Sequence, residues 1–237
     1  PSATGKIMKK DIDEIIIDIC NQDPSFTIKN KYIRDIEYKC FDNDISNLSK
    51  LFSLASNYKG KEMLIFEDER YTYEDSHELA SAFANALISE FKIKKGDRVA
   101  IASRNYPEWI NSFIAITSIG AIAVPLNSWW TSEELEYGIE NCGAKLIIVD
   151  NKRHELISPF SNKLNLKLIS IRSNKNQKNN WNNLTDIYKG LKMPRVDIKD
   201  DDDAAIFYTS GSTGHPKGVC SSHRAIISTL LQWSVIA

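Results

Sequence analysis

The most informative part of this sequence is YTSGSTGHPKGV, residues 208–219, which follows the apolar run at 204–207. Glycines at 211, 214 and 218 let the backbone approach a ligand and turn its N–H groups inward. The hydroxyl side chains add hydrogen-bond donors, and a lysine adds a positive charge. We therefore predict a polyphosphate-binding loop after a buried strand, with the binding residues Thr209, Ser210, Gly211, Ser212, Thr213, Gly214 and Lys217.

This loop differs from the two commonest phosphate-binding motifs. Lys217 is followed by Gly218, whereas a Walker A lysine is followed by the Ser or Thr that holds magnesium. The glycine spacing also differs from the dinucleotide pattern GxGxxG. A flexible glycine-serine linker does not follow a buried strand or precede proline, lysine and a helical pattern. The stretch thus indicates a third class of phosphate loop.

Upstream of the loop, predicted strands and helices alternate from residue 61 onward. Residues 63–66 and 70–73 form a predicted hairpin, and Thr72 with Asp75 forms a capping box for the next helix. Apolar runs without alternation are typical of strands buried on both faces of a parallel sheet. We predict an α/β fold with mainly parallel sheets flanked by helices, with strands at 99–102, 121–124, 146–149, 166–171 and 204–208. One helix is predicted after Pro107, and another is capped by Thr131 with Glu134 and ended by Gly143.

Three polar segments interrupt this pattern. Residues 21–60 mix turn-forming residues with charges, which predicts a linker or the irregular entrance to a new domain, with a boundary near 21–25. Residues 172–183 are dominated by Asn and Lys and predict a surface excursion. The acidic run 200–203 predicts a solvated turn rather than a metal site.

The composition excludes several classes of protein. The 237 residues are 42% hydrophobic and 26% charged, with a net charge of −1, so nothing calls for nucleic acid or an anionic membrane. No apolar run reaches the roughly 18 residues of a membrane span, and no signal-peptide pattern is present. We expect a cytoplasmic protein with reduced cysteines, since no CxxC pair occurs among Cys20, Cys40, Cys142 and Cys220.

The segment from Thr209 to Gly218 resembles the phosphate-binding signature of the adenylate-forming (AMP-binding) superfamily. That superfamily includes acyl-CoA synthetases, luciferases and the adenylation domains of peptide synthetases. Four further stretches resemble the opening of a bacterial fatty-acid–CoA ligase: RYTY at 70–73, GDRVA at 96–100, RNYPEW at 104–109 and VPLNSWWT at 124–131. The resemblance covers residues 25–237 and implies the N-terminal part of the large adenylate-forming domain.

The resemblance implies an ATP-dependent acid–thiol ligase. A carboxylate, for this branch a fatty acid, attacks the α-phosphate of Mg²⁺-bound ATP, and CoA then displaces AMP from the acyl-adenylate. Thr209 to Gly214 and Lys217 would hold the β- and γ-phosphates, and the serines would not act as nucleophiles. Two alternatives stay open: a non-catalytic nucleotide-binding module and a peptide-synthetase adenylation domain.

The first residues resemble a motif from the other end of the same superfamily. ATGKIMKK, residues 3–10, is similar to its C-terminal lysine motif, and an amphipathic helix is predicted from Met8 to Cys20. Lys6 would be the lysine that contacts the carboxylate and the α-phosphate. We therefore divide the chain into 1–22, the end of a preceding ligase module, and 23–237, the first half of a ligase N-terminal domain. A tandem-module junction, a fusion or gene-prediction artefact, and an ordinary basic helix start or rearranged ligase remain open.

The family's later magnesium- and ribose-binding motifs are absent from the sequence. We therefore expect that these 237 residues alone do not complete a catalytic cycle. His223 matches a position where the family commonly has histidine, and we expect it to cap or pack. His77, His154 and His215 are interpreted as surface or loop residues.

Overall fold

The computed structural model describes residues 27–33, 35–173, 179–209 and 215–236. The chain divides into two compact units, one made of residues 1–46 and 224–237 and the other of Asn47–His223. The predicted helix from Met8 to Cys20 and Lys6 lie outside the described residues. The predicted division at residue 22 also falls there, so it stays a prediction.

The first unit contains a hairpin of β1 (Ile28–Ile33) and β2 (Ile36–Phe41), paired antiparallel, and the helix α8 (His223–Ile236) except for its first residue. The expectation of an irregular linker over residues 21–60 was wrong for this hairpin. It was also wrong for α2 (Leu48–Ser53) and the 3₁₀ helix η2 (Leu54–Tyr58), which belong to the second unit. Each of these elements has only five or six residues, so its periodicity does not stand out from a loop.

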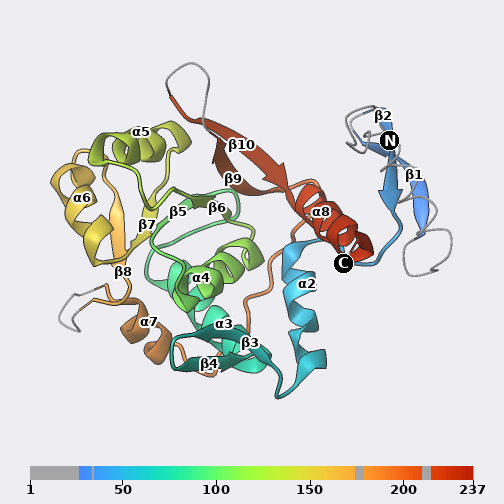
Figure 1. Ribbon diagram of the computed structural model, residues 1–237, viewed down its shortest axis with the longest axis horizontal. Coiled ribbons are helices and arrows are strands. Elements are labelled where there is room, and N and C mark those ends of the chain that lie inside the picture. The colour runs from blue at the N-terminus through green and yellow to red at the C-terminus, as the bar shows by residue number, and fades with distance from the viewer. Residues whose placement is uncertain (1–26, 34, 174–178, 210–214, 237) are drawn as a thin grey trace, which may run out of the picture. The chain divides into compact units, whose positions relative to one another are not determined.

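The second unit is built on a six-stranded sheet of order β10-β9-β6-β5-β7-β8 (Figure 1). The four inner pairings from β9 to β8 are parallel, and β10 pairs antiparallel with β9. This arrangement confirms the predicted α/β fold with a mainly parallel sheet. The strands are β5 (Arg98–Ala102), β6 (Ile122–Pro125), β7 (Leu146–Val149), β8 (Lys167–Ser170), β9 (Asp203–Thr209) and β10 (Lys217–Ser222).

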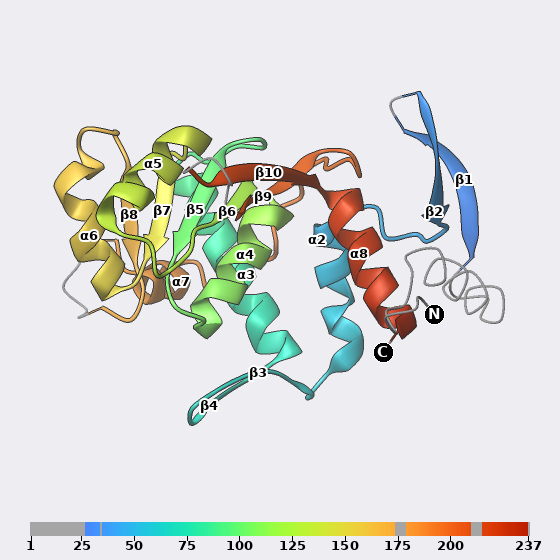
Figure 2. The same ribbon diagram turned by 45° about the horizontal axis from the view of Figure 1, so that its top comes forward.

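Helices cover the sheet, and a separate small hairpin of β3 (Glu62–Phe66) and β4 (Glu69–Thr72) precedes them (Figures 1 and 2). The helix after β4 starts at the predicted capping box of Thr72 and Asp75, and the one after β6 at that of Thr131 and Glu134. Gly143 ends this second helix in the left-handed conformation, with φ of 63°. The helices are α3 (Tyr73–Ser89), α4 (Pro107–Ser118), α5 (Ser132–Cys142), α6 (Asn151–Ser161) and α7 (Trp181–Ile187).

The core forms because alternate residues of the inner strands face opposite helix layers. Toward α5 and α6, small residues of β5 and larger ones of β7 contact the buried faces of the two helices. On the other side, α4 packs against α3 and contacts β5 and β6. Strands buried on both faces explain the absence of alternation in their sequences. The α5/α6 side includes Ala100, Ala102, Ile147, Val149, Leu135, Ile139, Ile157 and Phe160.

The prediction of a surface excursion over residues 172–183 was wrong at its end. Asn180 caps α7 by accepting from the N–H groups of residues 182 and 183, and it is 3% exposed. Trp181 is equally buried, packs against Phe83 and donates from its indole N–H to the hydroxyl of Ser112 at 3.0 Å. One tryptophan in a polar segment thus anchors a short helix whose own sequence is too polar to predict burial.

His223 is fully buried, and its packing role is confirmed within the second unit. Its Nδ1 atom accepts a hydrogen bond from the N–H of Leu48, 3.1 Å away, at the start of α2. Burial lowers the pKa of His223 from 6.5 to about 4, against an opposing effect of Asp202. The ring is therefore neutral at pH 7 and acts as a cap for α2.

Acidification is expected to destabilise the protein through His223. In the unfolded chain the ring gains a proton near pH 6.5, whereas in the folded chain it does so near pH 4. The unfolded state thus binds more protons in this window, and stability falls as pH drops through it, by up to about 3 kcal/mol. Denaturant unfolding between pH 7 and pH 4 measures this loss. His223→Asn keeps an acceptor without titrating and should show a flatter curve; an unchanged slope would contradict the assignment.

Candidate functional site

The predicted phosphate loop is carried by the β9–β10 hairpin. Thr209 ends β9 and Lys217 begins β10, and the two are paired in the antiparallel ladder. The hydroxyl of Thr209 donates to the carbonyl oxygen of Lys217 at 3.4 Å. The remaining predicted residues, Ser210, Gly211, Ser212, Thr213 and Gly214, lie outside the described residues. Among the described residues, one hydroxyl and one lysine therefore flank the loop at its two ends.

Two expectations about this hairpin need correction. The strand before the loop was expected to be buried, but only its first part is. Ala204 and Ala205 are inaccessible to solvent, whereas the side chain of Phe207 is 39% exposed. Behind the loop the sequence suggested a helix directly, but β10 intervenes before α8. Gly218 also has a packing reason, since a Cβ there would lie 2.9 Å from the Ile206 side chain. Its glycine is required by the hairpin itself.

The two ends of the predicted loop, Thr209 and Lys217, lie at the carboxyl edge of the parallel strands. Because β9 is parallel to β6, Thr209 ends at the same edge as β5, β6, β7 and β8. In open α/β sheets, ligands bind outside this edge, at the point where neighbouring strands send their connections in opposite directions. Here β5 leads through α4 to β6 on one side, and β7 leads through α6 to β8 on the other. The crevice between the ends of β5 and β7 is that point.

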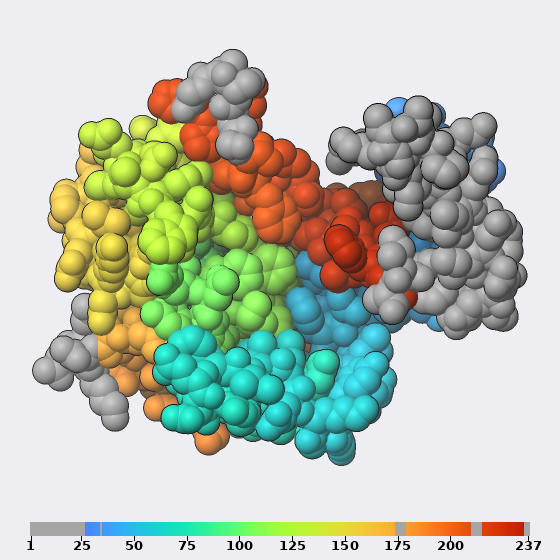
Figure 3. Space-filling view, viewed as in Figure 1, coloured from blue at the N-terminus to red at the C-terminus, as the bar shows by residue number. Residues whose placement is uncertain are grey.

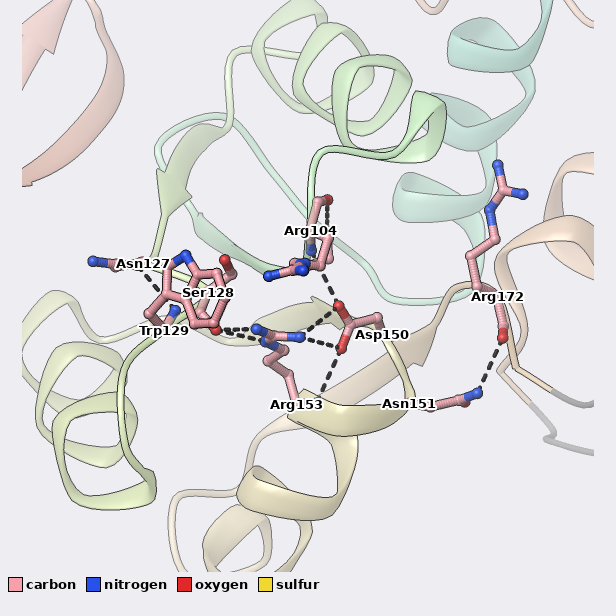
Figure 4. A network of polar contacts seen from close by, with 9 residues as sticks. Arg104, Asn127, Ser128, Trp129, Asp150, Asn151, Arg153 and Arg172 are labelled. Carbon is pink, nitrogen blue, oxygen red and sulfur yellow. Dashed lines mark hydrogen bonds and ion pairs between the residues drawn. The ribbon is translucent and has the colours of Figure 1, made fainter. Parts of the chain in front are cut away.

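A buried ion pair occupies the crevice (Figure 4). Asp150 follows β7 and caps α6 by accepting from the N–H of Arg153, whose guanidinium lies 3.1 Å from the Oδ2 atom. The same oxygen accepts from the N–H of Arg104 after β5, at 3.1 Å. Arg153 also donates to the carbonyl of Ser128 after β6, from Nε at 2.8 Å and from Nη2. One ion pair therefore fixes the backbone at the ends of three strands.

Arg172 extends this polar region beyond β8. Its guanidinium pairs with Glu69 of β4 and, from Nε at 2.8 Å, with Glu108 of α4. The hydrogen bond from Arg172, followed by that from Tyr71, lowers the pKa of Glu69 to about 2. The backbone of Arg172 is left-handed, with φ of 53°, and its carbonyl oxygen accepts a hydrogen bond from the side chain of Asn151 at 3.1 Å. A non-glycine residue in this conformation persists only where its surroundings hold it.

A hollow of about 370 Å³ opens beside these residues. Trp129 is 73% exposed on its rim, and the guanidinium of Arg104 lies 4.6 Å from the centre of its ring. Sequence reasoning missed this cluster, although polar residues directly after apolar strands were a usable signal. Besides the paired Arg153 and Arg172, the cationic side chains of Arg104 and Lys152 line the hollow and suit an anionic ligand group. The lining residues are Arg104, Tyr106, Trp129, Asp150, Asn151, Lys152, Arg153 and Arg172.

The three histidines interpreted as surface or loop residues contact protein side chains or are partly buried. His154 contacts the hydroxyl of Ser158 at 3.0 Å, and burial lowers the pKa of His77. His215 stacks on Tyr137 and so has a partner that the sequence did not predict. Among the described residues, no group of three or more His, Cys, Asp or Glu side chains could hold a metal ion. No helix in the described part of the chain is both long and apolar enough to span a bilayer.

A family model described as "AMP-binding enzyme" matches residues 51–237. The chain belongs to the AMP-binding enzyme family. The match includes the β9–β10 hairpin, the crevice and the whole parallel sheet. The resemblance drawn from the phosphate loop is therefore confirmed.

Similar members of the AMP-binding family are acid–CoA ligases. A 4-coumarate–CoA ligase of Arabidopsis thaliana is 32% identical over 81% of this chain and 35% of its own length. A long-chain-fatty-acid–CoA ligase of Mycobacterium tuberculosis is 30% identical over 70% of this chain and 32% of its own. The chain thus spans about a third of the length of these curated relatives.

Solved structures of AMP-binding enzymes agree with the fold. The inhibitor-bound N-terminal domain of FACL13 from Mycobacterium tuberculosis has a TM-score of 0.71 at 25% identity, over 80% of this chain and 47% of that one. The anthranilate CoA ligase AuaEII, in complex with anthranoyl-AMP, has a TM-score of 0.70 at 25% identity, over 77% of this chain and 36% of that one. The relatives together act on fatty, coumaric and aromatic acids, so the carboxylate is not specified by similarity.

Proposed function

We propose that this chain forms the phosphate-binding part of an ATP-dependent acid–CoA ligase whose carboxylate is a fatty acid. The observation that carries the proposal is the β9–β10 hairpin, which sets Thr209 opposite Lys217 at the carboxyl edge of the sheet. Hydroxyl and ammonium groups at such an edge suit a polyphosphate. The family membership and the acid–CoA ligases among the relatives support the same reaction class.

In the proposed reaction, a carboxylate oxygen bonds to the α-phosphorus of ATP, and the bond to the β-phosphate oxygen breaks. Pyrophosphate leaves with the displaced electron pair, and Lys217 with the loop hydroxyls would stabilise the charge that develops on it. The CoA thiolate then attacks the acyl carbon of the adenylate and releases AMP. Mg²⁺ would reach the site with the nucleotide phosphates, which are its usual ligands. The residues at the loop act by position and charge and form no covalent bond.

Several parts of this proposal concern residues outside the described ones. Ser210 to Gly214 are proposed to contact the β- and γ-phosphates, and Lys6 to serve a preceding ligase module of which residues 1–22 would be the C-terminal end. We also propose that these 237 residues alone do not turn over ATP. The length of the relatives, about three times the stretch matched here, supports this last point.

The test is ATP–pyrophosphate exchange by the intact gene product with a panel of acids: palmitate, octanoate, 4-coumarate, anthranilate and the amino acids. We expect exchange that depends on a fatty acid, followed by AMP release only when CoA is added. Exchange with 4-coumarate or anthranilate alone would replace the fatty acid in the proposal. Exchange with an amino acid, unaffected by CoA, would indicate a peptide-synthetase-type domain. ATP binding without exchange for any acid would indicate a non-catalytic module.

A further inference from the structure

Helix α5 holds both arms of the hairpin that carries the phosphate loop. On the β9 arm, the hydroxyl of Tyr208 lies 3.0 Å from the carbonyl oxygen of Gly138 and 2.7 Å from the Oδ1 atom of Asn141. On the other arm, the hydroxyl of Tyr137 donates to the carbonyl oxygen of Pro216 at 3.3 Å. Figure 3 shows the surface of the hairpin lying directly against that of α5. Hydrogen bonds from tyrosine side chains thus join this helix to both arms of the hairpin.

Tyr137 makes a second contact on the same arm. Its ring stacks on the imidazole of His215, with ring centres 4.6 Å apart and planes inclined by 26°. Stacking and hydrogen bonding together fix both the ring plane and the backbone of two consecutive residues. Pro216 restricts the backbone between His215 and Lys217, because its ring fixes φ. The orientation imposed at residue 215 is therefore passed on to Lys217.

Helix α5 is buried on one face, whereas the arm is exposed and pairs on one side only, with β9. Leu135 and Ile139 bury α5 in the core, and the ring of Trp130 closes over Gly138, where a Cβ would lie only 2.7 Å from it. By contrast, residues 217–220 at the start of β10 are exposed, and β10 is an edge strand of the sheet. A side chain that reaches this arm from the helix then has a large share in where the arm lies.

We propose that Tyr137 is a positioning residue that orients the His215–Lys217 arm, so that the Lys217 ammonium meets the nucleotide phosphates. This proposal rests on the proposed function for the role of Lys217. The contacts between Tyr137, His215 and Pro216 themselves are independent of that function. Tyr137 acts through the arm and touches no reacting atom.

The first test measures, in steady-state exchange by the intact protein, the effect of each substitution on the kinetic constants for ATP and for the acid separately. Tyr137→Phe keeps the ring but loses the hydrogen bond and should lower kcat/KM for ATP by about 2- to 10-fold, with KM for the acid unchanged. His215→Ala should have a similar effect, and adding it to Tyr137→Leu should cost little more, because both remove one contact. His215→Phe, which restores a stacking ring, should recover activity. Tyr188→Phe is the matched control. It also removes one tyrosine hydroxyl, but this hydroxyl donates to Glu90 rather than to the arm.

The second test does not depend on activity. Limited trypsin digestion of the intact protein, followed by mass spectrometry, reports cleavage after Lys217, and Tyr137→Leu should accelerate it on the order of 10-fold relative to Tyr188→Phe. Cleavage at the wild-type rate would overturn the proposal whatever the activity. Equal losses for ATP and acid, or simple additivity with His215→Ala, would also overturn it by indicating a general structural role. If the wild type shows no exchange but Tyr137→Leu still accelerates cleavage after Lys217, the proposed function is refuted. The contact between Tyr137 and the arm is then still supported.

Discussion

Replacing Lys217 with alanine is expected to lower kcat/KM for ATP in pyrophosphate exchange by about 100- to 1,000-fold. Lys217 is the cation at the start of β10, directly behind the predicted phosphate loop, and its backbone is fixed opposite Thr209. A positive charge held beside the leaving pyrophosphate stabilises the transition state more than the bound substrate, since charge grows there during the reaction. The loss should therefore fall largely on kcat.

Two control variants make this result specific. Lys59→Ala removes an equally exposed lysine in the turn after η2 and should leave exchange unchanged. Lys217→Arg keeps the charge but changes its shape, and partial activity is expected because phosphate needs charge more than one geometry. Wild-type exchange in Lys217→Ala would remove the lysine from the proposed site. The unfolding temperature of Lys217→Ala should match the wild type, because the side chain is exposed.

Removing the carboxylate of Asp150 is expected to cause the largest loss of stability among single substitutions in the crevice. The side chains of Asp150 and Arg153 are 6% and 5% exposed, so Asp150→Ala leaves a buried guanidinium without its counter-charge. It also removes the N-cap of α6 and the acceptor for the N–H of Arg104. Breaking such a pair on one side costs about 3 to 5 kcal/mol. Denaturant unfolding measured by circular dichroism reports this free energy.

An exposed ion pair in the same unit provides the matched control. Glu136 pairs with Lys163 at 2.7 Å, but the lysine side chain is 67% exposed, so Glu136→Ala should cost less than about 1 kcal/mol. Adding Arg153→Met to Asp150→Ala should recover part of the loss, because the unpaired buried charge is then absent. A cost for Asp150→Ala as small as that for Glu136→Ala would refute the structural role of the buried pair.

Local sequence signals were sufficient for the elements they specify. Thr72 with Asp75 and Thr131 with Glu134 formed the two predicted capping boxes, and Gly143 ended its helix as expected. Each of these signals lies within a few residues of the backbone group it satisfies, so it can be read without the fold. The same holds for the doubly buried strands, whose apolar runs needed no knowledge of their neighbours.

Long-range contacts could not be predicted in this way. The sequence around Trp181 does not indicate that its ring contacts Ser112 and Phe83. The sequence around His223 does not indicate that its ring accepts a hydrogen bond at the start of α2. These pairs depend on the strand order, which brings distant segments together. For that reason a polar segment that reads as a surface excursion can contain a buried tryptophan.

The family and the α/β class could be read from the residues alone, and glycines, hydroxyls and a lysine at fixed spacing predicted a phosphate loop, because such signals satisfy a local chemical requirement. The surroundings of the predicted loop became visible only in the folded chain. The tertiary structure showed that Thr209 and Lys217 stand on a hairpin, that Asp150 and Arg153 join three strand ends, and that Tyr137 reaches the arm of Lys217. The physical reason is that such contacts arise from packing between segments distant in sequence, whose relative positions depend on the whole sheet.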